Sequence, residues 1–104
     1  ITYAQHAIAL YDDLISQSSS NLRFRAARSN GYLLLAKALY ETNVEDAQAF
    51  CQNVLNELSD IVENNKEPEF TVPYIQALDC LGRRESQSGI VTMLQQQGVV
   101  NLEF

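Results

Sequence analysis

Few residues of this chain belong to the types that carry out catalysis or bind metals. The sequence contains one histidine, His6, in a segment whose pattern predicts a helix. An exposed histidine on a helical bundle can accept a phosphoryl group, but no basic residue follows His6 to hold the phosphate. We therefore interpret His6 as a solvated surface residue, with a phosphotransfer domain that uses it as the alternative.

The two cysteines, Cys51 and Cys80, have no CxxC pair or flanking histidine beside them. No zinc or redox motif fits this arrangement. A catalytic thiol would need a nearby base, and the histidine is expected on the outer face of another helix. We interpret both cysteines as small buried packing residues on adjacent helices, and a disulfide between them as the alternative.

Three arginines cluster at the start of the second predicted helix: Arg23, Arg25 and Arg28. An anion or an acidic peptide could bind there, helped by the free amides at the start of the helix. Ion pairs with acids such as Asp12 and Asp13 are the alternative interpretation of this anion patch.

The acidic residues are spread over predicted helix surfaces. They lack the close alternate spacing and the glycine of a calcium loop, so we expect them to be solvated. No nucleophile–base pair, metal-ligand set or glycine-rich phosphate loop accompanies them, so we predict no enzyme, no metal and no cofactor. The acids considered are Asp12, Asp13, Glu45, Asp46, Glu57, Asp60 and Glu63.

Length and composition predict one globular domain. The chain has 104 residues, of which 46% are hydrophobic and 19% charged. Its net charge of −6 argues against nucleic acid or an anionic membrane as the partner. No apolar stretch is long enough to span a bilayer and no signal peptide is visible, so we expect a cytoplasmic location. Because the chain starts at Ile1, we interpret it as a piece of a longer protein.

Apolar residues recur at helical spacing along the first and third of five segments, and end signals mark the others, which together predict an all-α fold of five helices. The polar run 18–21 separates the first two segments. The third has the clearest apolar stripe, which includes Val44, Cys51 and Leu58. The expected helices cover residues 3–17, 22–41, 43–63, 72–81 and 85–97.

Residues with strong end preferences mark the boundaries of these helices. Thr42 and Glu45 have the spacing of a capping box, which predicts a helix start between them. Pro68 bars continuation of the third helix, and Pro73 suits the first turn of the fourth. The last two helices are expected to end at glycines, Gly82 and Gly98.

The chain also repeats itself. A shift of 40 residues places Ala7 on Ala47 and Tyr11 on Cys51, and a shift of 42 residues places Tyr32 on Tyr74. A helix-pair period of roughly 40 residues is typical of an α-solenoid.

The residues of this repeat resemble those of the tetratricopeptide repeat. The motif Ala7-Ile8-x-x-Tyr11-x-x-Leu14-Ile15 resembles the second helix of such a repeat, and Leu35-Ala36-x-x-Leu39 followed by Ala47-x-x-x-Cys51-x-x-Val54-Leu55 resembles a whole one. The resemblance implies a TPR-like α-solenoid fragment of antiparallel helix pairs. An orphan helix, 3–17, would precede the pairs 22–41/43–63 and 72–81/85–97.

The resemblance implies a protein–protein interaction or oligomerisation module. It would be the sensor or regulatory part of a multidomain protein, such as a transcription regulator. The first helix of each pair would line a concave groove that binds a protein or peptide. Asp79 matches Lys37 with the opposite sign, which indicates a mixed groove rather than a carboxylate clamp. Carried over residue by residue, the groove positions are Asn30, Lys37, Glu41, Asp79 and Arg83.

The orphan helix has no partner within its own pair. We expect its face formed by Ala7, Ile8 and Tyr11 to meet neighbouring sequence or a second copy, which would give a homodimer. The apolar tail, 99–104, could cover the other end of the stack.

Overall fold

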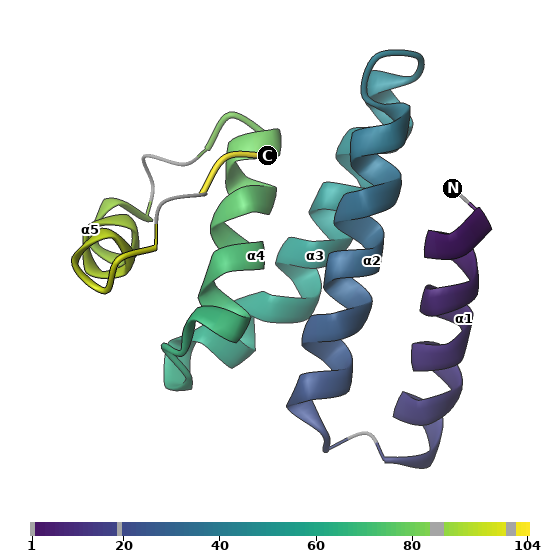
Figure 1. Cartoon of the computed structure of the whole chain (residues 1–104), viewed down its shortest axis with the longest axis horizontal. Coiled ribbons are helices and arrows are strands. Elements are labelled where there is room, and N and C mark those ends of the chain that lie inside the picture. The colour runs from purple at the N-terminus through teal and green to yellow at the C-terminus, as the bar shows by residue number, and fades with distance from the viewer. Residues whose placement is uncertain (1, 19, 84–86, 100–101) are drawn as a thin grey trace.

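The computed structural model describes residues 2–18, 20–83, 87–99 and 102–104. Within these residues the regular structure is helical, with five α-helices and no strand, so the predicted all-α class is confirmed. Figure 1 shows the helices in chain order: α1 (Thr2–Gln17), α2 (Leu22–Leu39), α3 (Val44–Asn64), α4 (Pro68–Cys80) and α5 (Ser88–Gln96).

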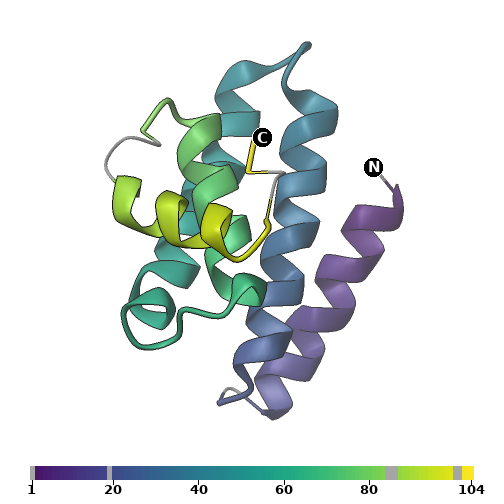
Figure 2. The ribbon, with the colours of Figure 1, turned by 60° about the vertical axis from the view of Figure 1, so that its left-hand side comes forward.

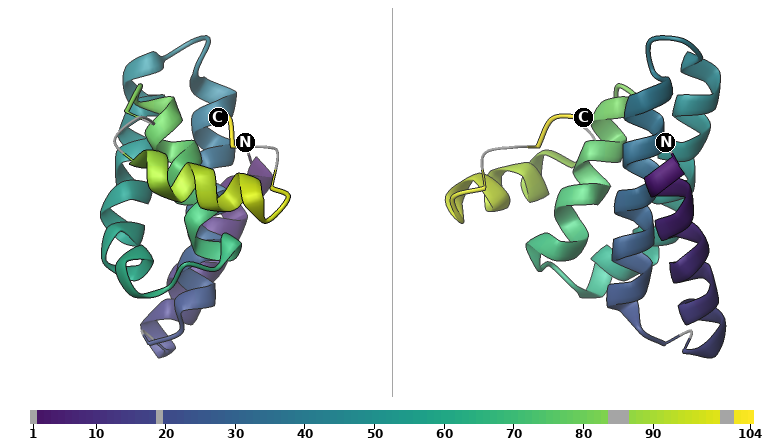
Figure 3. Two further views of the ribbon diagram at one scale, coloured as in Figure 1. Left: turned by 90° about the vertical axis from the view of Figure 1, so that its left-hand side faces the viewer. Right: turned by 45° about the vertical axis from the view of Figure 1, so that its right-hand side comes forward.

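The first four helices run up and down beside one another. α1 packs on α2, α2 packs on α3, and α4 contacts both α2 and α3. Figure 2 shows α5 lying across α4 instead of alongside it. Figure 3 shows α5 on the opposite side of the molecule from α1. α2 is therefore flanked by α1 on one side and by α4 on the other.

α3 supplies the largest part of the core. Its predicted stripe is buried from Ala47 to Val62, while Val44 at its start is 43% exposed. Residues from α2, α4 and α5 complete the same cluster, and Leu102 of the tail joins it at 2% exposed. Leu102 therefore packs into the core, where we expected the tail to cover the end of the stack.

Asparagines cap the second and third helices. The Asn21 side chain accepts the backbone N–H groups of Arg23 and Phe24, as expected from the polar run before α2. Asn43 caps α3 by accepting the Asp46 N–H at 3.1 Å. The predicted capping box with Thr42 as the cap is wrong by one residue, because the neighbouring asparagine takes that role.

α4 begins earlier than predicted. Pro68 is its first helical residue, after Glu67 as N-cap, so this proline starts a helix where we expected it only to end one. Pro73 lies inside α4, buried against the core. The end of α4 is as predicted. Gly82 adopts φ +70°, a left-handed conformation that favours glycine, and the Arg83 N–H bonds to the Leu78 carbonyl at 2.8 Å.

Cys51 of α3 and Cys80 of α4 form a disulfide, with Cα atoms 6.5 Å apart. Both residues are buried, at 0% and 5% exposed, as we predicted. Their interpretation as separate packing residues is corrected, because α3 and α4 pack closely enough for the two sulfurs to bond. The bond closes a loop that contains the turn between these helices.

None of the helices in the described part of the chain is both long and apolar enough to cross a membrane.

Candidate functional site

The side of the molecule where α2 meets α4 carries a hollow of about 230 Å³. Its lining combines apolar side chains with two amides and one cation. Leu34 is 54% exposed and adds apolar surface to this hollow. We call this hollow the α2–α4 groove; it is lined by Asn30, Leu33, Leu34, Lys37, Gln76 and Phe104.

The structure brings two of the five predicted groove residues into this hollow. Asn30 and Lys37 line it from α2, where both are exposed. Glu41 is exposed in the turn that follows α2 and does not line the hollow.

The other two predicted residues, on the side of α4, make contacts within the chain. Asp79 accepts the Phe104 backbone N–H at 2.9 Å. Arg83 lies beyond the end of α4, and its Nη2 donates to Gln52 Oε1 of α3 at 2.8 Å. The groove is therefore smaller and more apolar than the sequence predicted.

The last residues of the chain lie along this groove. Leu102 is inserted into the core, and the Phe104 ring packs against Tyr40 with ring centroids 5.5 Å apart. Phe104 also lines the hollow itself. This side of α2 and α4 thus holds a non-helical segment by apolar anchors and by one backbone hydrogen bond to a carboxylate.

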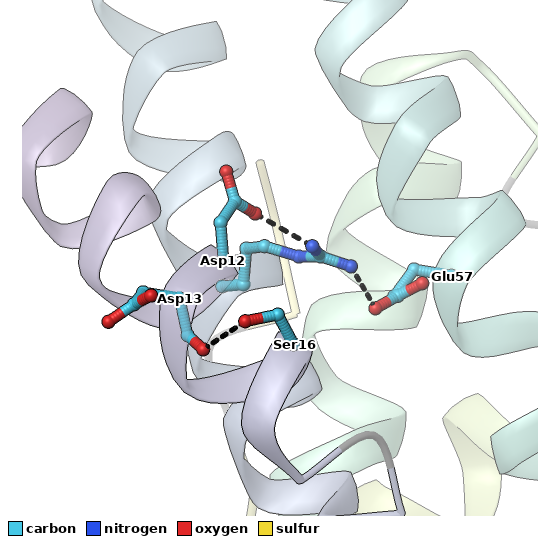
Figure 4. Close-up of polar contacts among 5 residues, drawn as sticks. Asp12, Asp13, Ser16 and Glu57 are labelled. Atoms are coloured by element: carbon cyan, nitrogen blue, oxygen red, sulfur yellow. Dashed lines mark hydrogen bonds and ion pairs between the residues drawn. The ribbon is translucent and has the colours of Figure 1, made fainter.

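The three predicted anion-patch arginines do not act together. Arg28 bridges two helices: Nη1 lies 2.7 Å from Asp12 of α1, and Nη2 lies 2.5 Å from Glu57 of α3. Figure 4 shows the guanidinium between the two carboxylates. The alternative that we kept open, ion pairing with Asp12, is what the structure contains. The Asp13 carboxylate instead accepts from Gln17, and the Asp13 backbone carbonyl accepts from Ser16.

The Arg28 bridge is partly shielded from water, since its side chain is 20% exposed and that of Glu57 is 19% exposed. Burial lowers the pKa of the Arg28 guanidinium, but its hydrogen bonds to Asp12 and Glu57 raise it, and the net shift is upward. Nearby Tyr32 has a raised pKa, chiefly because burial disfavours its phenolate; the charge of Arg28 lowers it, while those of Asp12 and Glu57 raise it.

The other two arginines are placed differently. Arg23 is exposed and lies 3.6 Å from Glu69 of α4. Arg25 is half-buried, and its Nε has no hydrogen-bond partner. Since Arg28 is already neutralised by two acids, the predicted patch of three free cations is not formed.

The predicted self-association residues of α1 divide between two faces. Ile8 packs on Gly31 of α2, and Tyr11 lies against Phe24 with ring centroids 6.2 Å apart. Ala7 and Tyr11 both line a hollow on α1. The complete lining is Tyr3, His6, Ala7, Leu10 and Tyr11.

His6 is exposed on α1, where we expected it. Its neighbours in the hollow are apolar or aromatic. In the described part of the chain, no group of three or more His, Cys, Asp and Glu side chains could hold a metal ion.

Comparison of the chain with protein families, with curated proteins and with solved structures found no match.

Sequence reasoning missed several residues of these surfaces. Leu34 was part of a stretch that reads as apolar almost all round, so its exposed position was not apparent. Tyr3 and Leu10 had a signal that could have found them, because they share three- and four-residue spacing with Ala7. Glu57 had no local signal, since it lies 29 positions from Arg28.

Proposed function

We propose that this chain is a protein–protein interaction module of the TPR-like type, in which the α2–α4 groove binds an extended segment of a partner protein. The observation that carries the proposal is the tail. Leu102 and Phe104 show how an apolar segment fits beside α2 and α4, and the open part of the groove continues from Phe104.

The lining of the groove indicates what the partner carries. Leu34 offers exposed apolar surface, and Lys37 offers a positive charge on the same side of α2. The Asn30 amide can both donate to and accept from a peptide backbone. A segment with an apolar side chain and a carboxylate a few residues away suits this combination, with apolar burial supplying affinity and the charge supplying selectivity.

The packing order of the helices supports the TPR-like part of the proposal. In a stack of helix pairs, the first helix of one pair packs on both helices of the pair before it. α4 contacts both α2 and α3 in this way, and α1 contacts α2 as the second helix of a preceding pair would. The orientation of α5 across α4 is a departure from a regular stack.

The same proposal includes self-association through α1 and a regulatory role within a larger protein, as the resemblance implies. It assigns no catalytic step to any residue. The sequence led us to propose a cytoplasmic location, but the Cys51–Cys80 bond favours an oxidising compartment, because disulfides persist mainly there. In the cytoplasm the two residues would be thiols, which alkylation of the protein before isolation would detect.

Selection from a random peptide library on the immobilised wild-type chain tests the groove. Peptides that bind there should lose affinity about tenfold or more for Leu34→Asp and for Lys37→Glu, because one substitution places a charge on the apolar surface and the other reverses the cation. Ala49→Asp is the control, since Ala49 is exposed on α3 and does not line the groove. Peptides that bind all four chains equally would contradict the proposed site.

A further inference from the structure

α1 carries a second apolar stripe beside the one that packs on α2. Its inner face, with Ala4 and Ile8, packs on α2, which is the only helix that α1 contacts within the described part of the chain. On its outer side Tyr3 is 81% exposed and Leu10 is 57% exposed. Ala7 and Leu14 continue this side and are half-buried. We call the four residues the α1 stripe: Tyr3, Ala7, Leu10 and Leu14.

The spacing of the α1 stripe is that of a seam between two helices. Its members follow one another at intervals of four, three and four residues, which is the heptad pattern of paired helices. The intervals read the same in both directions. Two copies of α1 in antiparallel orientation would therefore match, with Leu10 of each copy on Ala7 of the other and Tyr3 on Leu14.

This arrangement fits the side chains in size as well as in spacing. Each large leucine at position 10 would meet the small side chain of Ala7, so the two helices can approach closely at the centre. The contact is isologous, since the same patch is used by both copies, which is the commonest symmetry of protein dimers.

A hydrogen-bond donor and a hydrogen-bond acceptor beside the stripe, the His6 imidazole and the Asp13 carboxylate, are complementary in the same orientation. His6 and Asp13 are both exposed and lie seven residues apart, on one flank of the stripe. Antiparallel pairing brings His6 of each copy towards Asp13 of the other. Asp12 lies towards α3 and is already paired with Arg28. Two copies of a chain with a net charge of −6 repel each other. This face of α1 adds little to that repulsion, because Asp13 is its one acid.

We propose that a second copy of this chain docks on the α1 stripe, so that α1 pairs with α1 in antiparallel orientation about a twofold axis. This inference deepens the self-association part of the proposed function and rests on it. It places Tyr3, Leu10 and Leu14 in the interface instead of Ile8 and Tyr11. A seam of four side chains on a 16-residue helix is smaller than a standard interface of roughly 1,200–2,000 Å². We therefore expect a weak dimer, with a dissociation constant of about 1 μM or higher.

Sedimentation equilibrium of the whole chain, from about 1 μM to about 1 mM, tests the dimer and its surface. Leu10→Asp should weaken dimerisation at least about tenfold, because the carboxylate would be buried against Ala7 without a partner. Leu34→Asp is the matched control: it makes the same change at a similarly exposed leucine, 54% against 57%, on α2. Leu34→Asp should leave dimerisation unchanged and should remove peptide binding. The two proposals can therefore be tested separately.

A wild-type chain that stays monomeric over the whole range overturns the inference. A dimer that Leu10→Asp and Leu34→Asp weaken equally, or that neither weakens, overturns the assignment to the α1 stripe. Circular dichroism of each variant checks that the helices are intact, and both substitutions are at exposed positions that folding tolerates.

Cysteine cross-linking tests the antiparallel register. Ala7→Cys and Leu10→Cys chains, each with the Cys51–Cys80 bond already formed, are mixed and oxidised. The proposed register predicts that the mixed disulfide between positions 7 and 10 forms faster than either homodimer. Faster bonding between identical positions would indicate parallel helices and would overturn the register.

Discussion

Gly31 of α2 lies directly against Ile8 of α1, and a Cβ at Gly31 would come within 2.9 Å of Ile8 Cγ1. The backbone of α2 can approach α1 this closely because glycine has no side chain. The packing of α1 on the rest of the molecule therefore depends on a small residue in the middle of a helix, where glycine otherwise costs about 1 kcal/mol relative to alanine.

The effect of Gly31→Ala on the free energy of unfolding is predicted to depend on the side chain at position 8. In the wild-type chain we expect a loss of about 1 kcal/mol in the free energy of unfolding, because the overlap with Ile8 outweighs the gain in helix propensity. In an Ile8→Ala background the same substitution should stabilise by about 1 kcal/mol, since the overlap is gone. Urea unfolding of the four chains measures this coupling, and equal effects in both backgrounds would contradict it.

The Arg28 bridge is predicted to stabilise the contact among the first three helices. Arg28→Met should lower the free energy of unfolding by roughly 2 kcal/mol, because Glu57 would be left half-buried without its partner. Asp12→Asn should cost less than about 1 kcal/mol, since the Asp12 side chain is 51% exposed.

The control for Arg28→Met is Arg23→Met, whose side chain is 83% exposed. We expect this control to lie within about 0.5 kcal/mol of wild type. A similar loss for both arginines, measured by chemical unfolding, would argue against a special role for Arg28.

The disulfide is predicted to stabilise the fold without being needed to form it. Its cysteines are 29 residues apart, and closing a loop of this size stabilises by about 3–4 kcal/mol in the chain-entropy description. Urea unfolding with and without dithiothreitol should show this difference, with native helical content before the transition in both. Identical midpoints in the two conditions would mean that the bond is absent from the starting protein.

Tyr32 is predicted to make stability fall at alkaline pH. Its pKa in the folded chain is raised above the ordinary value of 10.0, so the folded state holds this proton more tightly than the unfolded state. The resulting stabilisation is complete below about pH 10 and is lost as the pH rises through the higher folded value.

The measurement for Tyr32 is the thermal midpoint at several pH values. Wild type should lose more stability than Tyr32→Phe between about pH 9 and pH 11, because phenylalanine has no proton to lose. Parallel curves for the two chains would show that Tyr32 does not contribute to the alkaline loss.

The tail is predicted to be part of the core. Leu102 is 2% exposed, so Leu102→Ala should cost about 2–4 kcal/mol through lost burial and the cavity left behind. Glu103→Ala is the neighbouring control, because Glu103 is exposed and its removal should change stability by less than about 0.5 kcal/mol. Equal effects of the two substitutions would mean that the tail does not pack in solution.

The helices of this protein could be predicted from its sequence because their signals are local. Apolar spacing and end signals together identified the five helices of the described residues, and the buried stripe of α3 was predicted almost completely. Gly82 and Gly98 both end helices with positive φ, as expected for residues without a Cβ. The errors at Thr42 and Pro68 are also local, because adjacent residues offered competing caps and starts.

Only the tertiary structure determined which segment packs against each helical face. Arg28 finds Glu57 across 29 positions, Cys80 meets Cys51 across the same separation, and Phe104 reaches Asp79 across 25. Both sides of α1 have apolar spacing, and the contacts of Ile8 with Gly31 and of Tyr11 with Phe24 determine which side packs on α2. Periodicity indicates that a face is apolar, but the partner of that face depends on distances between segments that no local pattern contains.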